Sequence, residues 1–357
     1  MRVVVLGGYG NFGARICRAL KVDRDIEVVA AGRNPQSVEG ARLDLSAPDF
    51  ASALRALSPD LVIHCAGPFQ GQDYRVAAAS IAAGAHYLDL ADGREFVARF
   101  AERNDALARA ADRIALSGAS TLPALSSAAV DHLGKRLNSI EGIRIAIAPG
   151  QKAPRGEATI AAVFGYAGKR FRWWSAGEWR DARGWQEMRR ERFDFGWRWA
   201  AACDVPDLEL FPKRYPGVRT VEFRAALELG LQQWALWLAA AARRAGVPLA
   251  IERRAALMNR VAGWMDGLGG EHGGMKIEIS GTRADGSKAR LEWQVTAPAE
   301  HGPEIPCMAA TLLARKLARG EIRERGAFAC MGFLALAEFE GEFTRWNITT
   351  RTTERDA

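Results

Sequence analysis

The first thirteen residues constrain the fold most, because they predict a strand, a glycine-rich turn and a helix in direct succession. Residues 2–6 are a short β-branched run, and an amphipathic helical pattern begins after the glycines. The turn has the G-x-G-x-x-G spacing that binds a dinucleotide when it joins a strand to a helix. A plain tight turn is the alternative. We predict that a dinucleotide contacts Gly8, Gly10, Asn11, Phe12 and Gly13.

The second predicted strand, residues 26–31, leads to the position that recognises the adenosine ribose, about 20 residues beyond the glycines. The sequence at this position is Arg33-Asn34. A carboxylate here would bind the ribose 2′-hydroxyl of NAD, whereas an arginine accommodates the 2′-phosphate of NADP. Arg33 and Asn34 therefore favour NADP(H) over NAD(H), unless Arg33 is a solvated loop residue. Asp44 either reaches the adenine edge or belongs to a surface turn.

A third apolar run, residues 60–66, has the composition of a buried parallel strand, which Gly67-Pro68 ends. In doubly wound sheets, ligands lie beyond the carboxyl ends of the strands. We therefore expect the end of this strand and the turn after it to line the nicotinamide side of the cofactor, through Cys65, Ala66, Gly67, Pro68 and Phe69. Alternating helix and strand patterns up to residue 117 predict further parallel strands with right-handed crossovers.

Three segments together resemble the NADP-binding domain of the saccharopine dehydrogenase (saccharopine reductase-like) family. They are Gly7-Gly-Tyr-Gly-Asn-Phe-Gly13, Cys65-Ala-Gly-Pro-Phe69 and Gly84-Ala-His-Tyr-Leu-Asp89, and the resemblance covers about the first 130 residues. The family includes saccharopine-forming enzymes and bacterial members of unassigned substrate. The substrate-binding residues of the fungal-type reductase have no match here, so the resemblance carries over the fold and the cofactor class but not saccharopine itself.

The resemblance implies an α/β fold: a Rossmann-type doubly wound parallel sheet with a second, inserted α+β domain. We place the dinucleotide-binding domain at residues 1–122 and the α+β substrate or dimerisation domain at residues 123–300. By the same resemblance, residues 301–357 return to the first domain. Strand-like runs in the second domain predict a mostly antiparallel sheet, at residues 142–148, 219–223, 275–280 and 291–295.

Residues 169–199 hold six of the eleven tryptophans, interleaved with arginines. Such interleaving can stack single-stranded nucleic acid, but aromatic residues and arginine are also what the cores of protein interfaces enrich. Acidic residues are mixed into the segment and offset most of its positive charge. We therefore favour a homodimer interface or a substrate lid over nucleic acid.

Residues 227–244 predict an apolar helix that contains Trp234 and Trp237 and ends in two arginines, where cations suit the helix dipole. A helix that is apolar on all sides is usually buried. The alternative is a helix that lies in a membrane surface and gives the chain peripheral membrane contact. Its uncharged stretch, residues 229–242, is shorter than the ~20 residues that a spanning helix needs.

Reduction of a carbonyl or imine needs a hydride from the cofactor and a proton donor of suitable pKa, most often histidine. We predict this donor among His301 and Glu304, in a loop held by two prolines, and Asp89, His86 and Tyr87 in the first domain. Structural roles compete with this interpretation, since His86 could be a strand-end histidine and Glu304 a charge at a helix N-terminus.

Composition excludes several classes of protein. The 49 basic and 42 acidic residues give a net charge of +7, but the basic residues alternate with Asp and Glu, which argues against a nucleic-acid-binding tail. The five cysteines include no C-x-x-C pair, so we expect a reducing cytoplasm, no disulfides and no metal. The N-terminus leaves no room for a signal peptide before the first strand. H-E-x-x-H, Walker and G-x-S-x-G motifs are missing, which argues against metal-dependent hydrolysis, phosphoryl transfer and serine hydrolysis.

These patterns predict a cytoplasmic NADP(H)-dependent oxidoreductase that transfers a hydride to or from a C=N, C=O or C=C bond of a small-molecule substrate. The apolar helix and the tryptophans favour a hydrophobic or amphipathic substrate. Two other classes stay open at this point. One is a non-catalytic NADP-binding sensor or assembly protein, and the other is a lipid-associated protein at a membrane surface.

Overall fold

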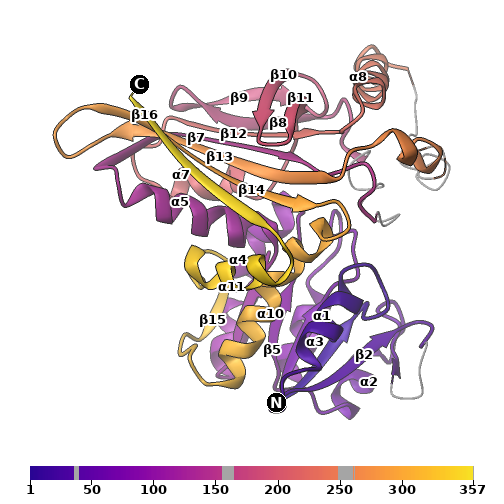
Figure 1. Ribbon diagram of the computed structural model, residues 1–357. Coiled ribbons are helices and arrows are strands. Elements are labelled where there is room, and N and C mark those ends of the chain that lie inside the picture. Colours follow the sequence, from indigo (N-terminus) through magenta and orange to yellow (C-terminus); the bar gives the residue numbers. More distant parts are fainter. Residues whose placement is uncertain (36–39, 155–164, 248–259, 261, 357) are drawn as a thin grey trace. The chain divides into compact units, whose positions relative to one another are not determined.

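The computed structural model describes residues 1–35, 40–154, 165–247, 260 and 262–356, and the chain divides into two compact units (Figure 1). Unit 1 consists of Met1–Ser127 and Pro303–Leu334. Unit 2 consists of Ala128–Gly302 and Ala335–Ala357. Each unit has its own β-sheet.

Unit 1 is built on a parallel seven-stranded sheet whose strand order is β15-β6-β5-β4-β1-β2-β3. The strands are β1 (Arg2–Leu6), β2 (Glu27–Gly32), β3 (Ala41–Arg42), β4 (Leu61–His64), β5 (His86–Asp89), β6 (Ile114–Ser117) and β15 (Gly326–Ala329). The order reverses between β1 and β4, which is the arrangement of a Rossmann sheet and places a ligand crevice at their carboxyl ends. The predicted doubly wound α/β fold is confirmed.

Five α-helices of unit 1 join or cover these strands. They are α1 (Gly13–Leu20), α2 (Phe50–Ala56), α3 (Arg75–Ala82), α4 (Arg94–Ala110) and α10 (Ile305–Ala318). Every residue of β4 and β6 is buried, which explains why these strands read as unbroken apolar runs instead of alternating patterns. A π-helical turn, Thr121–Leu125, follows β6.

The C-terminal part of the chain is shared between the two units. The segment Pro303–Leu334 adds α10 and the edge strand β15 to unit 1. The prediction assigned all of residues 301–357 to the first domain, but Ala335–Ala357 lies in unit 2, because its strand β16 (Thr349–Asp356) pairs with β14 (Lys288–Pro298). In Figure 1 the yellow strand β16 runs along the orange strand β14.

Unit 2 carries a nine-stranded mixed sheet with the order β10-β11-β12-β7-β13-β14-β16, and β8 and β9 extend it from β12. Its other strands are β7 (Ser139–Ala148), β8 (Arg170–Ser175), β9 (Glu178–Arg183), β10 (Arg189–Phe193), β11 (Gly196–Ala202), β12 (Thr220–Ala226) and β13 (His272–Thr282). Only β7 and β12 pair in parallel among the described strands of this sheet, so the predicted α+β unit with a mostly antiparallel sheet is confirmed.

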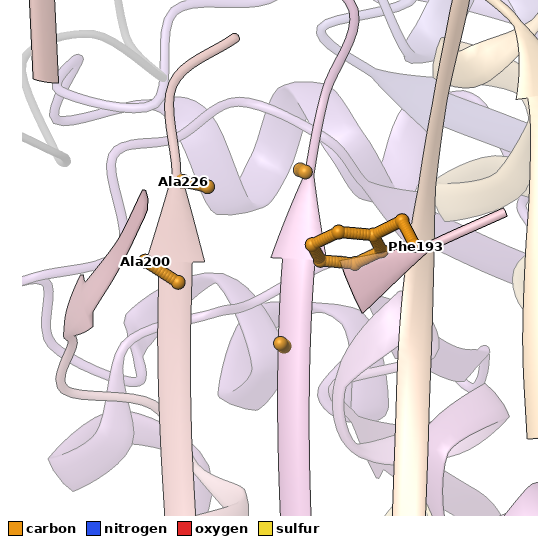
Figure 2. Close-up of a cluster of buried hydrophobic side chains, with 5 residues drawn as sticks. Phe193, Ala200 and Ala226 are labelled. Carbon is orange, nitrogen blue, oxygen red and sulfur yellow. The ribbon is translucent and has the colours of Figure 1, made fainter. Parts of the chain in front are cut away.

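The tryptophan-rich segment forms the four strands β8 to β11 of unit 2. A small core lies where β10, β11, β12 and β7 meet, and its members are Ala146, Ala148, Phe193, Ala200 and Ala226. Figure 2 shows the Phe193 ring directed toward the neighbouring strands, whose alanines leave room for it. Alanine on one side and a large ring on the other is the complementary packing that fills a core without voids. The described helices of this unit are α5 (Ser126–Gly134), α7 (Asp207–Arg214), α8 (Gly230–Arg244) and α11 (Leu336–Arg345).

Candidate functional site

The glycine-rich turn after β1 is shaped by contacts that exclude side chains. A Cβ atom on Gly13 would overlap the carbonyl oxygen of Gly7, so α1 can begin this close to the turn only with glycine. A Cβ atom on Gly8 would lie 2.9 Å from the Cα atom of Ala30 in β2. Both glycines therefore serve the packing of the turn itself, as the fingerprint requires.

Gly10 differs from these two glycines because the protein leaves space beside it. The residue is exposed, and the nearest heavy atom to a Cβ placed there is the Gly7 carbonyl oxygen at 3.2 Å. Its backbone N–H donates to the same oxygen at 2.9 Å. The packing of the turn therefore requires glycine less strictly at position 10 than at positions 8 and 13. Free space beside the backbone is expected where a ligand approaches it closely.

The glycine-rich turn after β1 contacts the loop after β4. The sequence analysis predicts that both segments bind the same cofactor. Gly7 has a φ of +77°, and a Cβ atom on it would lie 3.1 Å from the backbone nitrogen of Ala66. Gly67 and Pro68 are exposed beyond this contact, whereas Phe69 is buried. The structure therefore brings the predicted pyrophosphate and nicotinamide segments together at the strand-order reversal.

A buried histidine and a glutamine hold the loop after β4 in place. His64 Nδ1 accepts a hydrogen bond from the Ala66 N–H at 3.3 Å, and its Nε2 lies 3.2 Å from Gln72 Oε1. The Gln72 amide in turn donates to the carbonyl oxygens of Ala66 and Pro68, at 3.0 and 2.7 Å. Burial lowers the pKa of His64 to about 4, which keeps the ring neutral, as this pattern of one donor and one acceptor requires.

The predicted ribose position is a hollow of about 410 Å³ lined by Arg33, Asn34, Arg42 and Asp44. Arg42 was not predicted, although it stands beside Gly32 in the pairing of β2 with β3. The sequence does show a strand-like run around residue 42. This run contains β3, which pairs with β2, the strand that ends just before Arg33. Two arginines at this place make a site for a phosphate dianion.

Asp44 stands in the same hollow and is held as an anion. Its Oδ1 accepts hydrogen bonds from the hydroxyl and the backbone N–H of Ser46, at 2.6 and 3.0 Å. These bonds, and then the charges of Arg33 and Arg42, hold the pKa of Asp44 below its usual value. The Asp44 side chain thus accepts hydrogen bonds within its own turn. In the hollow it is the one carboxylate beside two cations, Arg33 and Arg42.

Asp89 ends β5 at the carboxyl edge of the sheet but is fully buried. Its Oδ1 accepts three hydrogen bonds, from Gly118 N–H at 2.7 Å, Ala91 N–H at 3.0 Å and Ser117 Oγ at 3.0 Å. Burial raises the pKa of Asp89 to about 6, although these donors oppose the shift. The carboxyl group therefore fastens the ends of β5 and β6 together.

Tyr87 is also fully buried, and its ring stacks on Phe100 of α4. Its hydroxyl lies near the Asp89 carboxyl group, which influences its pKa. Burial, followed by the charge of Asp89, raises the pKa of Tyr87 well above its usual value. Tyr87 and Asp89 are brought together by the structure, inside the protein and away from its surface.

His86 lies at the opposite end of β5, where it pairs with Leu61 at the start of β4. The strand separates it from Asp89 by three residues, or about 10 Å. His86 Nδ1 accepts a hydrogen bond from the Ile114 N–H at 3.1 Å, and burial lowers its pKa to about 4. The structure therefore does not bring His86 to the edge where the glycine turn lies.

Glu304 precedes α10 and forms an ion pair with Arg15 of α1, at 3.0 Å. Both side chains are largely buried. Arg15 also donates to the backbone carbonyl and the side-chain oxygen of Asn11, each at 2.8 Å. Glu304 is therefore linked through Arg15 to Asn11 in the glycine turn.

His301 belongs to unit 2 and is half-buried. Its Nδ1 lies 2.7 Å from the carbonyl oxygen of Trp346, and the two rings meet edge to face. Because a carbonyl oxygen only accepts, Nδ1 must carry the hydrogen in this bond. Nε2 has no hydrogen-bond partner in the described part of the chain, so this nitrogen can exchange a proton.

The cysteines do not form a reactive or metal-binding centre in the described residues. Burial raises the pKa of Cys65 well above its usual value, and the same cause raises that of Cys17 to about 11. Cys65, beside the predicted nicotinamide segment, is therefore a thiol and not a thiolate nucleophile. Across the part of the chain that the structure describes, no three His, Cys, Asp or Glu residues are grouped to hold a metal ion.

Comparison with known proteins agrees with this geometry. Residues 3–115 match the family described as the saccharopine dehydrogenase NADP-binding domain. No curated protein sequence matches the chain. Among solved structures, saccharopine dehydrogenase (L-Glu forming) from Saccharomyces cerevisiae superposes with a TM-score of 0.68 at 12% identity, over 99% of each chain.

A more distant neighbour is the DAP dehydrogenase of C. glutamicum, with a TM-score of 0.49 at 14% identity over 96% of this chain and 98% of that one. The yeast enzyme shows that the fold extends over both units, since the match covers the whole length of each chain. The parallel sheet, the glycine turn and the family match agree over the same residues. Residues 3–115 of this chain are thus similar to the NADP-binding domain of the saccharopine dehydrogenase family, and the fold of the whole chain is similar to that of the yeast enzyme.

Proposed function

We propose that this chain is an NADPH-dependent oxidoreductase that transfers a hydride to or from a C=N, C=O or C=C bond of a small-molecule substrate. The observation that carries the proposal is the contact between the glycine turn after β1 and the loop after β4, at the reversal of the strand order. In open α/β sheets this is where a dinucleotide binds.

The residues present fit the cofactor along its length. Gly10 leaves open space at the turn, and the start of α1 carries no acidic residue in its first turn that would repel a pyrophosphate. The exposed Gly67 and Pro68 would face the nicotinamide. When bound, the reduced nicotinamide supplies the hydride, and the chain supplies the orientation and the proton.

The preference for NADPH over NADH rests on Arg33 and Arg42. Two guanidinium groups line the hollow at the ribose position, and the single carboxylate there is already capped by Ser46. An NAD-specific site would instead present an uncapped carboxylate to the ribose 2′-hydroxyl. We propose that the two arginines bind the 2′-phosphate.

For the proton we propose His301. The bond to Trp346 keeps a hydrogen on Nδ1, so Nε2 would take up a proton from solvent to give the imidazolium and then deliver that proton to the substrate. In this role His301 would supply the proton that the nitrogen, the oxygen or the second carbon of the reduced bond takes up. His301 stands two residues before Pro303, with which the chain re-enters unit 1.

Tyr87 and Asp89, also predicted as donors, are fully buried, and Glu304 is engaged with Arg15. We therefore give these residues structural and positioning roles in the proposal. A hydrophobic or amphipathic substrate, a homodimer and a cytoplasmic location stay predictions from the sequence.

The cofactor assignment is tested by titrating the protein with NADPH and NADH while following tryptophan fluorescence. We expect Arg33→Ser and Arg42→Ser each to weaken NADPH binding about tenfold or more while leaving NADH binding nearly unchanged, because each removes a charge-assisted contact to phosphate. Arg24→Ser, at an exposed arginine after α1, is the matched control and should change neither affinity. Equal affinity for both cofactors in the wild type would contradict the 2′-phosphate assignment.

Turnover is tested by screening carbonyl, imine and enoyl compounds for NADPH oxidation. His301→Gln should lower kcat at least a hundredfold with NADPH affinity unchanged, since a general acid contributes about 10²–10⁴-fold. Tight NADPH binding with no turnover on any of the three classes would instead favour a non-catalytic NADP sensor.

A further inference from the structure

The outer face of the β10–β11 hairpin in unit 2 carries arginine and tryptophan. Arg190 lies opposite Trp199 in the strand pairing and Arg192 lies opposite Trp197, so the four side chains share one face. Arg190 Cζ lies 5.1 Å from the centre of the Trp197 ring and 5.9 Å from that of Trp199. The other face of the hairpin holds Phe193 of the small core. The arginines and both tryptophans therefore point away from that core.

Helix α8 packs against β11 and continues this face (Figure 1). The ring of Trp234 meets that of Trp199 edge to face, with 5.6 Å between their centres. Leu231, Trp234 and Leu238 follow one another at intervals of four residues or fewer, which places them on one side of the helix. Gln233 is fully buried on another side. An ordinary surface helix exposes its polar residues, whereas α8 exposes leucine and tryptophan and buries glutamine.

The segment just before β13 adjoins α8. Met265 in this segment contacts Gln232 of α8, whose Nε2 lies 3.6 Å from the methionine sulfur. Trp264 and Leu268, on either side of Met265 in the sequence, are exposed. We define the unit 2 apolar surface as Trp197, Leu231, Trp234, Leu238, Trp264 and Leu268, which are 53%, 72%, 41%, 60%, 78% and 73% exposed.

The size of the unit 2 apolar surface favours a protein partner. A leucine or tryptophan presents about 200 Å² when fully exposed, so these residues leave about 750 Å² of apolar area in contact with solvent. The largest apolar patch on a typical monomer is about 300–600 Å². Each partner in a standard protein–protein interface contributes about 800 Å². The surface is therefore larger than a monomer usually exposes and about as large as a stable dimer buries on each copy.

The margins of this surface carry charges of both signs. Glu187 is exposed in the turn before β10, and this turn lies beside α8 because the Gln186 amide donates to the carbonyl oxygen of Trp237 at 3.0 Å. Arg192 is exposed near the other end of β10, opposite Trp197. An anionic bilayer would attract Arg192 but repel Glu187. Margins of mixed sign instead match a protein surface that carries both charges.

We infer that two copies of this chain associate through the unit 2 apolar surface, about a two-fold axis that lies in the interface and runs across β10. This axis reverses the direction of β10 between the copies, so the Glu187 margin of one copy meets the Arg192 margin of the other. An axis along β10 would set like charges against each other. Tryptophan and arginine are also the residue types that dominate the binding energy of interfaces. The association concerns unit 2 alone and does not depend on the cofactor assignment.

Sedimentation equilibrium of the full chain tests the inference. We expect a dimer whose dissociation constant rises at least tenfold in Leu231→Gln/Leu238→Gln, because the variant removes apolar area from the centre of the interface. Val22→Gln/Leu107→Gln, at exposed apolar residues of unit 1, is the matched control and should dimerise like the wild type. A wild-type chain that stays monomeric at high micromolar concentration would overturn the inference, and so would a dimer that the α8 variant leaves unchanged.

Charge reversal at the margins tests how the two copies face each other. Glu187→Arg and Arg192→Glu should each weaken the dimer about fivefold, because each sets like charges against each other. The double variant Glu187→Arg/Arg192→Glu should regain most of the lost affinity, since it restores opposite charges in exchanged positions. A double variant that is as weak as the two single effects combined would overturn the two-fold association.

Circular dichroism spectra and thermal melting of each variant verify that its fold is intact. Flotation with vesicles of phosphatidylcholine, with and without phosphatidylglycerol, provides the other arm. None of the described helices has the length and apolar character needed to span a membrane. A chain that is monomeric in solution, floats with vesicles and loses flotation in Leu231→Gln/Leu238→Gln would assign the unit 2 apolar surface to a lipid bilayer and overturn the dimer.

Discussion

At the scale of single residues, Gly10 and Gly13 belong to one motif but are glycine for different physical reasons. A side chain on Gly13 would collide with the backbone of Gly7, whereas one on Gly10 meets only the Gly7 carbonyl at 3.2 Å. We predict that Gly10→Ala folds with nearly wild-type stability but binds NADPH at least tenfold more weakly, because its methyl group enters the space of the ligand. Gly13→Ala should lose both stability and binding.

Urea unfolding and NADPH titration of the two variants distinguish these effects. The outcome that would contradict this assignment is Gly10→Ala with normal NADPH affinity, since the space beside Gly10 would then serve no ligand. A loss of stability in Gly10→Ala as large as in Gly13→Ala would show that the turn needs both glycines for packing.

The buried carboxyl of Asp89 predicts a specific dependence of stability on pH. Its pKa is raised to about 6 in the folded protein, so folding favours the protonated form. The stabilisation is present below the unfolded pKa of about 4 and is lost as the pH rises through 6. Asp89→Asn keeps an oxygen for the three donors and removes the charge. We predict that it raises the free energy of unfolding at pH 8 by about 1–3 kcal/mol.

The gain in Asp89→Asn should shrink progressively as the pH falls from 6 to 4, which urea unfolding at each pH measures. Asp60→Asn, at an exposed aspartate that accepts from the Arg2 N–H at 2.6 Å, is the control for the effect of the same substitution at the protein surface. A loss of stability in Asp89→Asn at pH 8 would mean that the ionised carboxylate holds Gly118 and Ser117 better than an amide does.

At the scale of elements, α10 supports α1 across a long separation in sequence. Glu304 pairs with Arg15, and Arg315 pairs with Asp23 at 2.9 Å. Arg15 also donates hydrogen bonds to Asn11 in the glycine turn. We predict that Glu304→Gln lowers the free energy of unfolding by about 1–3 kcal/mol, because a largely buried guanidinium loses its counter-charge. It should also weaken NADPH binding a few-fold.

The control for this prediction is Glu321→Gln, which removes an exposed ion pair with Arg319 and should cost less than about 1 kcal/mol. Chemical unfolding and NADPH titration give the two readouts. If Glu304→Gln loses turnover while stability and NADPH affinity stay unchanged, Glu304 acts on the substrate and the positioning role is wrong.

The sequence predicted the elements whose signals are local. The glycine turn, the apolar run before Gly67-Pro68 and the strand that ends at Asp89 are each contained in a few consecutive residues, and the sheet of unit 1 follows from their order. Arg42 was missed because the strand-like run around it does not reveal its partner, and the place of Arg42 depends on the pairing of β3 with Gly32. The ion pair between Glu304 and Arg15 was not predicted, because the two residues lie almost the whole chain apart in sequence.

The tryptophan-rich segment shows what composition alone does not reveal. Arg170 and Arg172 are exposed in β8 while Phe171 and Trp173 are buried, which is the alternation of a strand with one face inward. The period of two is present in the sequence, but the interleaving of arginine and tryptophan predicts an interface or a lid without indicating which side chains face inward. In helix α8 the sequence has no pattern that predicts which side is buried. Nothing in it indicates that Gln233 is buried and Leu231 exposed.

At the scale of the whole molecule, unit 1 is discontinuous in sequence. Its sheet is complete only when β15 pairs with β6, and α10 covers α1 only after the chain has returned from unit 2. We predict that residues 1–127 alone do not fold cooperatively, because the edge of β6 and the apolar side of α1 lose their partners. Residues 1–127 joined to 303–334 by a flexible Gly/Ser linker should fold and bind NADPH.

Circular dichroism melting and NADPH titration of the two fragments check this prediction. A cooperative transition for residues 1–127 with NADPH affinity near that of the full chain would show that α10 and β15 are dispensable for the nucleotide-binding fold. Failure of the joined fragment together with normal behaviour of the full chain would show that unit 1 depends on unit 2.

The late return of β15 has a consequence for how the protein is made. Roughly 200 residues separate β6 from the strand that completes its sheet, and a ribosome needs about 10–40 s to add them. Throughout that time the nascent chain exposes an unpaired strand edge that another nascent chain can join. Unit 1 therefore begins to emerge before unit 2 but is finished only after most of unit 2 has been synthesised. Its dependence on chaperones should exceed that of a nucleotide-binding domain encoded in one uninterrupted stretch, and protease protection of stalled chains that end before and after residue 334 would reveal it.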